Sequence, residues 1–329
     1  MKIGVCAWSF SGAHAATGAA LDPHHPEGLA ALARQHQLRL IECAATPFRN
    51  AEPAALDLFL RTLADDGIEI VLDTGGNPAE DETQLRETLE VAARIGARVV
   101  RTTISGVLEG DRTAYGLADW TAYLHATVEP LKRLMGIAEA AEIAVGIENH
   151  QDICSWELCW LCEQVGSDLL GSTFDVGNAF AVGETPQAFL DRVLPYLVHV
   201  HIKDYVAHPT EAGYRLTRCA IGSGAVQWPE LLQRIAGEAP GVAACIELGA
   251  TTTRHIRLLE EAYWSTFPPR PPGETTAAIA MLQNAARSDG EDWRTPHERR
   301  EGPAEQIAYE MAQFEESVAY LKALNLPPG

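Results

Sequence analysis

The stretch IAVGIENHQDICSWELCWLCEQVGSDLLGSTFD, residues 143–175, contains a complete strand–helix–strand unit. Ile143–Glu148 and Leu170–Asp175 are short apolar runs, and each of them ends in a carboxylate. Between them, Ser155–Val165 has apolar residues at helical spacing and is followed by Gly166, a residue type at which helices commonly end. This order predicts two parallel strands joined by a crossover helix.

The same unit recurs along the chain. Helical patterns separate the strand-like runs, and Gly67, Gly96 and Gly237 stand where such helices would end. The first run leads into Cys6–Gly12, which lacks the G-x-G-x-x-G loop of a dinucleotide-binding sheet. Eight strands alternating with helices therefore favour an α/β fold of the closed (β/α)8 TIM-barrel type. The six further strand-like runs are Lys2–Ala7, Arg39–Ala44, Ile68–Asp73, Arg98–Thr103, Leu197–Lys203 and Val242–Leu248, and the further helical segments include Glu27–His36, Asp81–Ile95, Leu131–Glu142, Gln187–Val193 and Pro229–Ile235.

The region after the eighth run departs from this pattern. The prolines of Phe267–Gly273 argue against a regular helix there, because proline lacks the amide donor and restricts its neighbour. A charged stretch, Ser288–Glu301, follows, and Glu305–Leu324 has the pattern of a last amphipathic helix. We expect one TIM-barrel domain over residues 1–329, with residues 262–304 inserted before that helix. The insertion is either a lid or subunit contact, or a surface loop.

Charge and composition narrow the class of protein. The 329 residues include 45 acidic and 25 basic side chains, a formal net charge of −20. Such a surface repels phosphate backbones, so we expect no nucleic-acid partner. No apolar run approaches the ~20 residues of a membrane span, and the opening run is too short for a secretion signal. We therefore expect a cytoplasmic protein. The seven scattered cysteines indicate free buried thiols, since Cys159 and Cys162 have no second CxxC pair.

Four consecutive strand-like runs place a metal-binding side chain at their carboxyl ends: Glu148, Asp175, His201 and Glu247. In a TIM barrel these ends meet at one rim, where active sites lie. Because side chains alternate along a strand, the large apolar residue preceding each of the four should face the helices, and the polar residue should face inward. Three carboxylates together repel one another unless a cation lies among them. This donor set suits Mn²⁺, Mg²⁺ or Co²⁺, with Zn²⁺ as a further option.

With these motifs the chain resembles the sugar phosphate isomerase/epimerase superfamily, the xylose isomerase-like barrels. The resemblance covers residues 1–260 and the last helix, and implies that the four residues bind one divalent metal, usually manganese in the ketose 3-epimerases. It also implies that Glu148 and Glu247 exchange protons with the substrate carbon. The matching motifs are Ile147–His150, Phe174–Asn178, His199–Asp204, Gly222–Gly224 followed by Trp228, and Ile246-Glu247.

The match departs from the ketose 3-epimerases at three positions, so we expect different substrate recognition. Asn178 stands in place of a histidine, Ala207 in place of an arginine and Cys154 in place of a substrate-contacting glutamate. His150 lies two residues after Glu148, a placement similar to that in inosose dehydratases and the larger subunits of 3-oxo-C-glycoside deglycosidases. We interpret His150 as a catalytic base or as a residue that orients Glu148.

Further candidates for substrate contact lie around the same rim. Trp8 offers an apolar wall for a sugar ring, and Glu42, Asp73 and Arg101 end strands where they either contact hydroxyls or brace a neighbour. Lys203 has the parity of His201 and would reach a substrate oxyanion or Asp204. The Gly222–Gly224 loop is interpreted as a simple turn in preference to a phosphate loop.

The leading hypothesis is a metal-dependent sugar isomerase or epimerase that transfers a proton next to a carbonyl. The first alternative is a lyase of the same fold, a keto-sugar dehydratase or a 3-oxo-C-glycoside deglycosidase. An apurinic-site endonuclease-like hydrolase and a non-catalytic subunit are weaker alternatives, because the charge disfavours DNA and all four ligands are present. The expected partner is a small sugar-like substrate. A homo-oligomer and a hetero-subunit both stay open.

Overall fold

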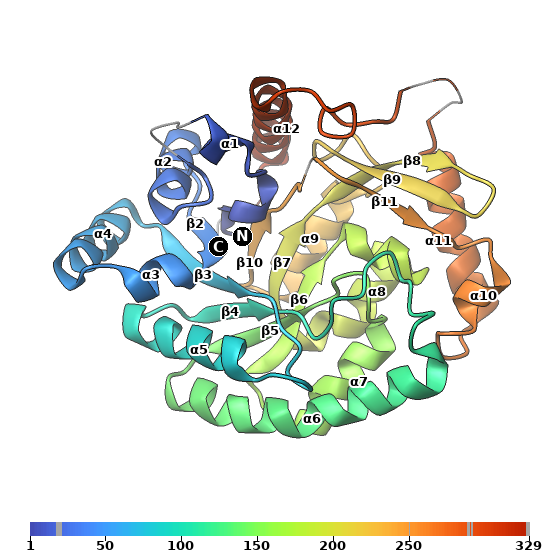
Figure 1. Cartoon of the computed structure of the whole chain (residues 1–329), viewed down its shortest axis with the longest axis horizontal. Coiled ribbons are helices and arrows are strands. Elements are labelled where there is room, and N and C mark those ends of the chain that lie inside the picture. Colours follow the sequence, from blue (N-terminus) through green and yellow to red (C-terminus); the bar gives the residue numbers. More distant parts are fainter. Residues whose placement is uncertain (18–21, 250, 288–289, 291, 327–329) are drawn as a thin grey trace.

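The protein forms a closed barrel of eight parallel strands, as the alternating pattern predicts. The structure, a computed structural model, describes residues 1–17, 22–249, 251–287, 290 and 292–326. Around the barrel the strands follow the order β1-β10-β7-β6-β5-β4-β3-β2, and helices surround them (Figure 1). All eight predicted runs are barrel strands: β1 (Ile3–Cys6), β2 (Leu40–Ala44), β3 (Glu69–Thr74), β4 (Val99–Thr102), β5 (Ala144–Glu148), β6 (Leu170–Asp175), β7 (Leu197–Ile202) and β10 (Ala243–Ile246).

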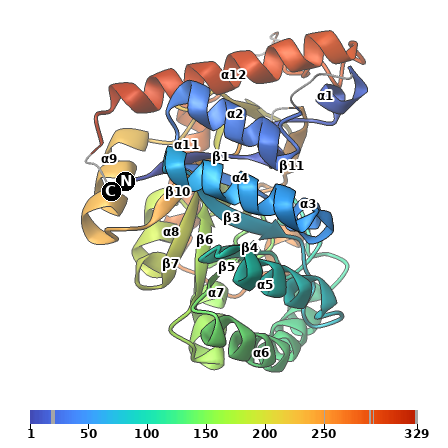
Figure 2. The same cartoon turned by 90° about the vertical axis from the view of Figure 1, so that its left-hand side faces the viewer.

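One long helix follows each barrel strand before the next strand begins. The last of them, α12, runs along α1 and α2 (Figure 2), and its Phe314 ring packs against His36 of α2. These helices are α2 (Pro26–His36), α4 (Pro53–Asp66), α5 (Thr83–Ile95), α6 (Gly116–Ala140), α7 (Ser155–Val165), α8 (Pro186–Val193), α9 (Trp228–Glu238) and α12 (Pro303–Ala323). The further helices are α1 (Ala13–Ala16), α3 (Thr46–Asn50), α10 (Glu261–Trp264) and α11 (Pro272–Asn284), with 3-10 turns at Ala7–Ser9, Gly177–Val182 and Leu194–Tyr196.

Most predicted helix boundaries are off by one to three residues, and three differences have a clear physical origin. Helix α6 begins at Gly116 and not near Leu131, because Pro130 lies inside it and interrupts the helical pattern without ending the helix. Gly237 does not end a helix, since α9 continues to Glu238. Pro272, within the stretch expected to be non-helical, starts α11, where its missing amide costs no hydrogen bond.

The alternation of side chains along the strands is as expected. Ile147, Phe174, Val200 and Ile246 are fully buried in the large core between strands and helices, where Phe174 stacks on Phe189 of α8 at 5.2 Å. Inside the barrel a separate small cluster fills the space between the strands. Its buried members are Cys6, Leu40, Val71 and Cys245. The residues on the inner face at the carboxyl ends are therefore left to build a polar site.

A second, antiparallel sheet lies beside the barrel and was not predicted. It contains β8 (Asp204–Pro209), β9 (Tyr214–Cys219) and β11 (Thr253–Ile256) in the order β11-β9-β8. A tight turn joins the first two strands, where the Thr210 amide donates to the Gly213 carbonyl at 2.9 Å. The sheet therefore consists of a hairpin after β7 and a strand after β10. In Figure 1 it lies above and to the right of the barrel, with α10 and α11 at the outer edge.

Residues of the expected insertion, 262–304, pack against this second sheet. The Arg287 amide donates to the Ala207 carbonyl of β8 at 2.9 Å, and the Tyr214 hydroxyl donates to Gln283 at 3.0 Å. On the opposite face of the sheet Glu298 pairs with Arg215. Of the charged stretch Ser288–Glu301, residues 288, 289 and 291 lie outside the described residues. Among the described helices, none is long and apolar enough to cross a membrane.

Candidate metal centre and active-site cavity

Glu148, Asp175, His201 and Glu247 come together at the carboxyl-terminal mouth of the barrel. One possible ligand atom from each lies within 4.8 Å of those from the other three, and all four residues are buried. The strand register explains this convergence, since Asp175 of β6 is paired with His201 of β7, and His201 with Cys245 of β10, two residues before Glu247. Neighbouring parallel strands thus bring side chains of the same parity to one level.

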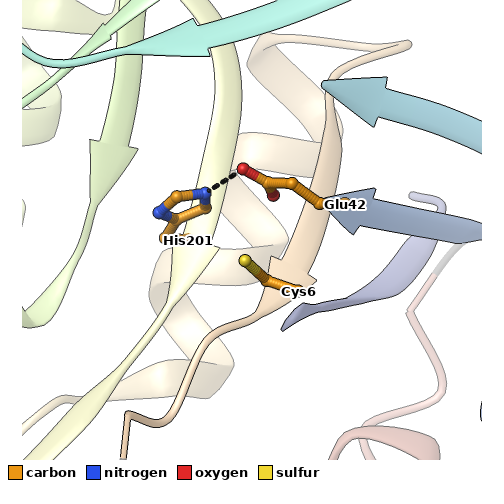
Figure 3. Close-up of side chains that lie close together, drawn as sticks. All are labelled: Cys6, Glu42 and His201. Carbon is orange, nitrogen blue, oxygen red and sulfur yellow. Dashed lines mark hydrogen bonds and ion pairs between the residues drawn. The ribbon is translucent and has the colours of Figure 1, made fainter. Parts of the chain in front are cut away.

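The two nitrogens of the His201 ring have different surroundings. Nε2 lies 2.8 Å from Oε1 of Glu42, an oxygen that only accepts, so the ring proton lies on Nε2 (Figure 3). Nδ1 faces the carboxylates instead, 2.6 Å from Oε2 of Glu247 and 3.5 Å from Oε2 of Glu148. A carboxylate holding the far nitrogen is the usual arrangement around a metal-binding histidine. The orientation of His201 therefore fits a metal ligand.

The carboxylates of the cluster also fit a divalent cation. Oδ1 of Asp175 is buried and has no hydrogen-bond partner in the part of the chain that the structure describes. Burial raises the pKa of Asp175 to about 7, which the Lys203 charge only partly opposes. Three carboxylates and one imidazole are a donor set for a hard or intermediate divalent ion, and such an ion would remove the repulsion between them.

Two cationic side chains reach into the cluster. The Nζ atom of Lys203 donates to Oδ2 of Asp175 at 2.5 Å and to Oε1 of Glu247 at 3.1 Å. Arg101 donates to Glu148, and its Nη1 lies 3.3 Å from Oδ1 of Asp73. Burial alone would raise the pKa of Glu148, but Arg101, His201 and His150 together outweigh burial and hold that pKa well below its usual value. Both cations therefore favour the ionised form of the carboxylates that they contact.

Glu42 lies beneath the cluster and is fully buried. Its Oε2 accepts from Nε2 of His199 at 3.0 Å, while its Oε1 accepts from His201, so two imidazoles occupy both oxygens. Cys6 and Cys245 lie close enough to Glu42 and these histidines to form three-residue groups of metal-binding type (Figure 3). Burial raises the pKa of both thiols well above its usual value. Because a thiolate is the metal ligand, these groups fit a structural support better than a second metal site.

A cavity of about 400 Å³ opens beside the cluster. Five of the residues expected at the site line it: Trp8, Asp73, Arg101, His150 and Glu247. Trp8 stands half exposed at the rim. Nδ1 of His150 is buried and without a hydrogen-bond partner within the described ranges, and burial lowers the pKa of this imidazole to about 4. The cavity therefore contains an uncharged imidazole whose ring nitrogen is available. Glu42 and Lys203, also expected to touch substrate, do not line it.

Asn178, one of the departures from the ketose 3-epimerases, bridges two of the candidate ligands. Its Nδ2 donates to Oδ2 of Asp175 at 2.7 Å and faces Oε1 of Glu148 at 3.4 Å. Its Oδ1 accepts from Gln151 and from the Tyr205 hydroxyl, each at 3.0 Å. The amide therefore holds two carboxylates in place where an imidazole would add a further titrating group.

The Gly222–Gly224 loop forms a turn around a buried carboxylate. Asp204 accepts hydrogen bonds from the amides of Gly222, Gly224 and Val226 and from the Trp228 indole, at 3.0 to 3.2 Å. With these amides directed at Asp204, the loop does not present them to a phosphate group. This supports the turn interpretation.

Sequence reasoning missed several residues of the cavity wall. Thr103 and Ser105 come from the loop after β4, whereas Arg218 and Arg254 come from β9 and β11 of the second sheet. The hairpin did leave a signal, since Thr210–Gly213 is a turn-like segment between two runs with alternating polarity. The pairing of β11 with β9 left none, because it joins segments more than thirty residues apart.

Comparison with known proteins matches this chain to one family of TIM barrels. Residues 19–283 match the family model described as xylose isomerase-like TIM barrel. The 3-oxo-isoapionate decarboxylase of Pectobacterium atrosepticum is 24% identical over 221 residues, which is 64% of this chain and 74% of that protein.

Solved structures of two other proteins share the fold. A D-tagatose 3-epimerase-like protein has a TM-score of 0.57 and 17% identity over 86% of this chain and 99% of its own. The probable 3-DHS dehydratase AsbF of Bacillus anthracis has a TM-score of 0.60 and 15% identity over the same shares of the two chains. At these identities the likeness concerns the fold.

Proposed function

Since the chain belongs to the family of xylose isomerase-like TIM barrels, we propose that it is a divalent-metal-dependent sugar isomerase or epimerase. The observation that carries the proposal is the convergence of Glu148, Asp175, His201 and Glu247 within 4.8 Å beside a cavity large enough for a small sugar. The reaction is proton transfer next to a carbonyl group of the substrate.

The four residues would hold the metal through three carboxylates and Nδ1 of His201. An ion bound there supplies Lewis acidity, which polarises a carbonyl and makes the neighbouring C–H more acidic. Three oxygen donors and one nitrogen favour Mn²⁺, with Mg²⁺, Co²⁺ or Zn²⁺ as alternatives. Glu42 acts as a positioning residue, because both of its oxygens are held by His199 and His201.

His150 and Glu247 are the residues that move protons. Both line the cavity, and Nδ1 of His150 has no competing hydrogen bond among the described residues. Nδ1 takes the proton from the carbon next to the carbonyl. Return of that proton by His150 at the neighbouring carbon completes isomerisation. Epimerisation requires Glu247 in its protonated form, which delivers its proton to the opposite face of the carbon, and the proton on His150 then returns to Glu247 through water. Glu148, which is ion-paired with Arg101, serves as a ligand.

The remaining contacts orient the sugar. Trp8 presents its ring at the rim as an apolar wall, and the Arg101 guanidinium lines the cavity beside Asp73. Lys203 holds Asp175 and Glu247 in place through ion pairs with both carboxylates. The ion pairs hold Arg101 and Lys203 in place before substrate arrives, whereas Trp8 stays half exposed at the rim.

A lyase of the same fold is the second candidate, and one specific observation favours it. The relative at 24% identity is named a decarboxylase of a 3-oxo acid. Loss of a carboxyl group, or of a hydroxyl group on the next carbon, passes through the same electron-rich carbon beside a carbonyl. After loss of CO₂, His150 would deliver a proton to this carbon. In a dehydration, His150 would remove the proton from the carbon and then return it to the departing hydroxyl group, which leaves as water.

Metal analysis and proton exchange test the proposal together. The purified protein is analysed for bound metal, and then incubated in D₂O with a panel of ketoses, keto-sugar acids and keto-sugar phosphates, followed by NMR. Deuterium at a carbon next to the carbonyl, with no loss of mass from the substrate, supports the isomerase or epimerase. Release of CO₂ or an unsaturated product supports the lyase. Exchange that persists unchanged after complete removal of metal contradicts both.

A further inference from the structure

The second sheet forms one wall of the cavity and contributes two arginines to it. In the antiparallel register Arg254 of β11 is opposite Leu216 of β9, and Arg218 lies two residues further along β9. Opposed residues and residues two apart share a face, so Arg218 and Arg254 are diagonal neighbours on one face of this sheet. Both line the cavity that also contains Glu247.

Neither arginine has a carboxylate partner within residues 1–17, 22–249, 251–287, 290 and 292–326. The other two cations of the barrel mouth, Arg101 and Lys203, are each ion-paired there. Nε of Arg218 and Nε of Arg254 are buried and have no hydrogen-bond partner among the same residues. In a chain with 45 acidic side chains and 25 basic ones, two neighbouring arginines without a carboxylate partner, one buried and one partly buried, need an explanation.

Arg218 is held firmly in its position. Its Nη1 donates to the carbonyls of Gly249 and Thr252 at 2.8 and 3.0 Å, and to the Thr252 hydroxyl at 2.7 Å. Arg254 makes one long bond, 3.4 Å, from Nη1 to the Thr253 carbonyl. One side of the Arg218 guanidinium is therefore anchored, and its remaining donors are left for a ligand.

The arrangement costs electrostatic free energy when nothing is bound. Burial lowers the pKa of Arg254, and the neighbouring Arg218 lowers it further, because two like charges lie in one partly buried space. Glu109 lies on the same side, but its Oε1 already accepts from the His255 amide at 3.0 Å. A negatively charged ligand would remove this repulsion and would satisfy the unused N–H groups.

We infer that Arg218 and Arg254 form a binding site for an oxyanion of the substrate, a carboxylate or a phosphate. This rests on the proposed function and names its substrate class: a keto-sugar acid or a keto-sugar phosphate, and not a neutral sugar. The anionic end lies against the second sheet, while the carbonyl end lies against Glu247 and His150. A cavity of about 400 Å³ holds a molecule of this size.

Three probes with one carbon skeleton test this inference by calorimetry on the metal-loaded protein: D-glucitol, D-gluconate and D-glucitol 6-phosphate. We expect at least one anion to bind about tenfold or more tightly than glucitol, as is typical of a charge-assisted contact. Arg254→Gln and Arg218→Gln should each reduce that preference to less than about threefold and leave glucitol binding unchanged. The anion whose affinity falls most in these variants shows whether a carboxylate or a phosphate is the group that the two arginines bind.

Arg215→Gln is the matched control, because Arg215 lies on the same strand but is paired with Glu298 on the opposite face. It should keep the preference. Arg254→Gln is the variant less expected to disturb folding, since the Arg254 side chain makes few hydrogen bonds within the protein. Circular dichroism checks that both variants are folded. The inference is overturned if glucitol binds as tightly as the anions, if the preference survives in both variants, or if Arg215→Gln removes it equally. Proton exchange in D₂O is read separately, so failure of the chemistry and failure of the anion site are distinguishable.

Discussion

Oε1 of Glu42 lies 2.8 Å from Nε2 of His201, and this contact determines which nitrogen of the ring faces the three carboxylates. The second oxygen of Glu42 holds His199 at 3.0 Å in the same way. One buried carboxylate thus fixes two imidazoles, one in the barrel interior and one at its mouth. The buried Glu42 anion also raises the pKa of His201, against the effect of burial, which shows how strongly the two groups interact.

Glu42→Gln should weaken metal binding without removing any proposed ligand. A glutamine amide accepts through only one oxygen, so one of the two imidazoles loses its partner and His201 can turn or change tautomer. We expect the affinity for Mn²⁺ to fall by roughly 10- to 100-fold, the range for such supporting carboxylates. Calorimetric titration with Mn²⁺ measures it. Exposed Glu90→Gln serves as the control, and equal affinities for Glu42→Gln and wild type would show that Glu42 does not position His201.

Metal should stabilise the folded protein, and Asp175 should carry much of this effect. At a metal concentration of 100 times Kd the stabilisation is about 2.7 kcal/mol, which corresponds to a rise in Tm of roughly 4 °C for a chain of this length. In Asp175→Asn this rise should shrink to about 1 °C, since the amide is a weak ligand. Differential scanning fluorimetry with Mn²⁺ and with EDTA measures both. If Asp175→Asn and wild type respond alike to Mn²⁺, Asp175 does not bind the metal.

The eight barrel strands and the convergence of four side chains follow from local patterns in the sequence. Each of Glu148, Asp175, His201 and Glu247 lies at the end of an apolar run, and the period of two along a strand decides the face on which it lies. The second sheet depends on contacts that no local pattern records. Thr253–Ile256 is only four residues long, and it becomes a strand because it pairs with β9. Arg218 and Arg254 therefore could not be placed at the cavity.

The partners of Glu42 and Lys203 were also beyond prediction, for a different reason. The alternation of side chains along a strand directs both residues into the barrel, but residues at different depths in the barrel have different neighbours. Glu42 lies below the metal-binding cluster and contacts two imidazoles, whereas Lys203 contacts the carboxylates of Asp175 and Glu247. Depth in the barrel depends on the stagger between strands, and this becomes visible only in the three-dimensional register.

His150→Gln should separate catalysis from metal binding. Because His150 lines the cavity and its Nδ1 has no partner among the described residues, its loss should slow deuterium exchange into substrate by roughly 10²- to 10⁴-fold. Bound metal, measured by elemental analysis, should stay at the wild-type level. The opposite pattern, with metal lost together with activity, would mean that His150 orients Glu148.

Asp152 should make the stability of the protein depend on pH in a defined direction. Burial raises its pKa from the usual 3.8 to about 7, although Ser105 donates to its Oδ2 at 2.6 Å. Between these two values the folded state binds more protons than the unfolded state, so this group lowers the free energy of unfolding as pH rises. Asp152→Asn has no such titration. Its free energy of unfolding relative to wild type should therefore increase from pH 4 to pH 7, by up to ~1.4 kcal/mol per pH unit.

Urea unfolding of both proteins in EDTA at several pH values measures the difference, in which the other titrating groups cancel. Parallel curves across this range would show that Asp152 is ionised in the folded protein at every pH tested.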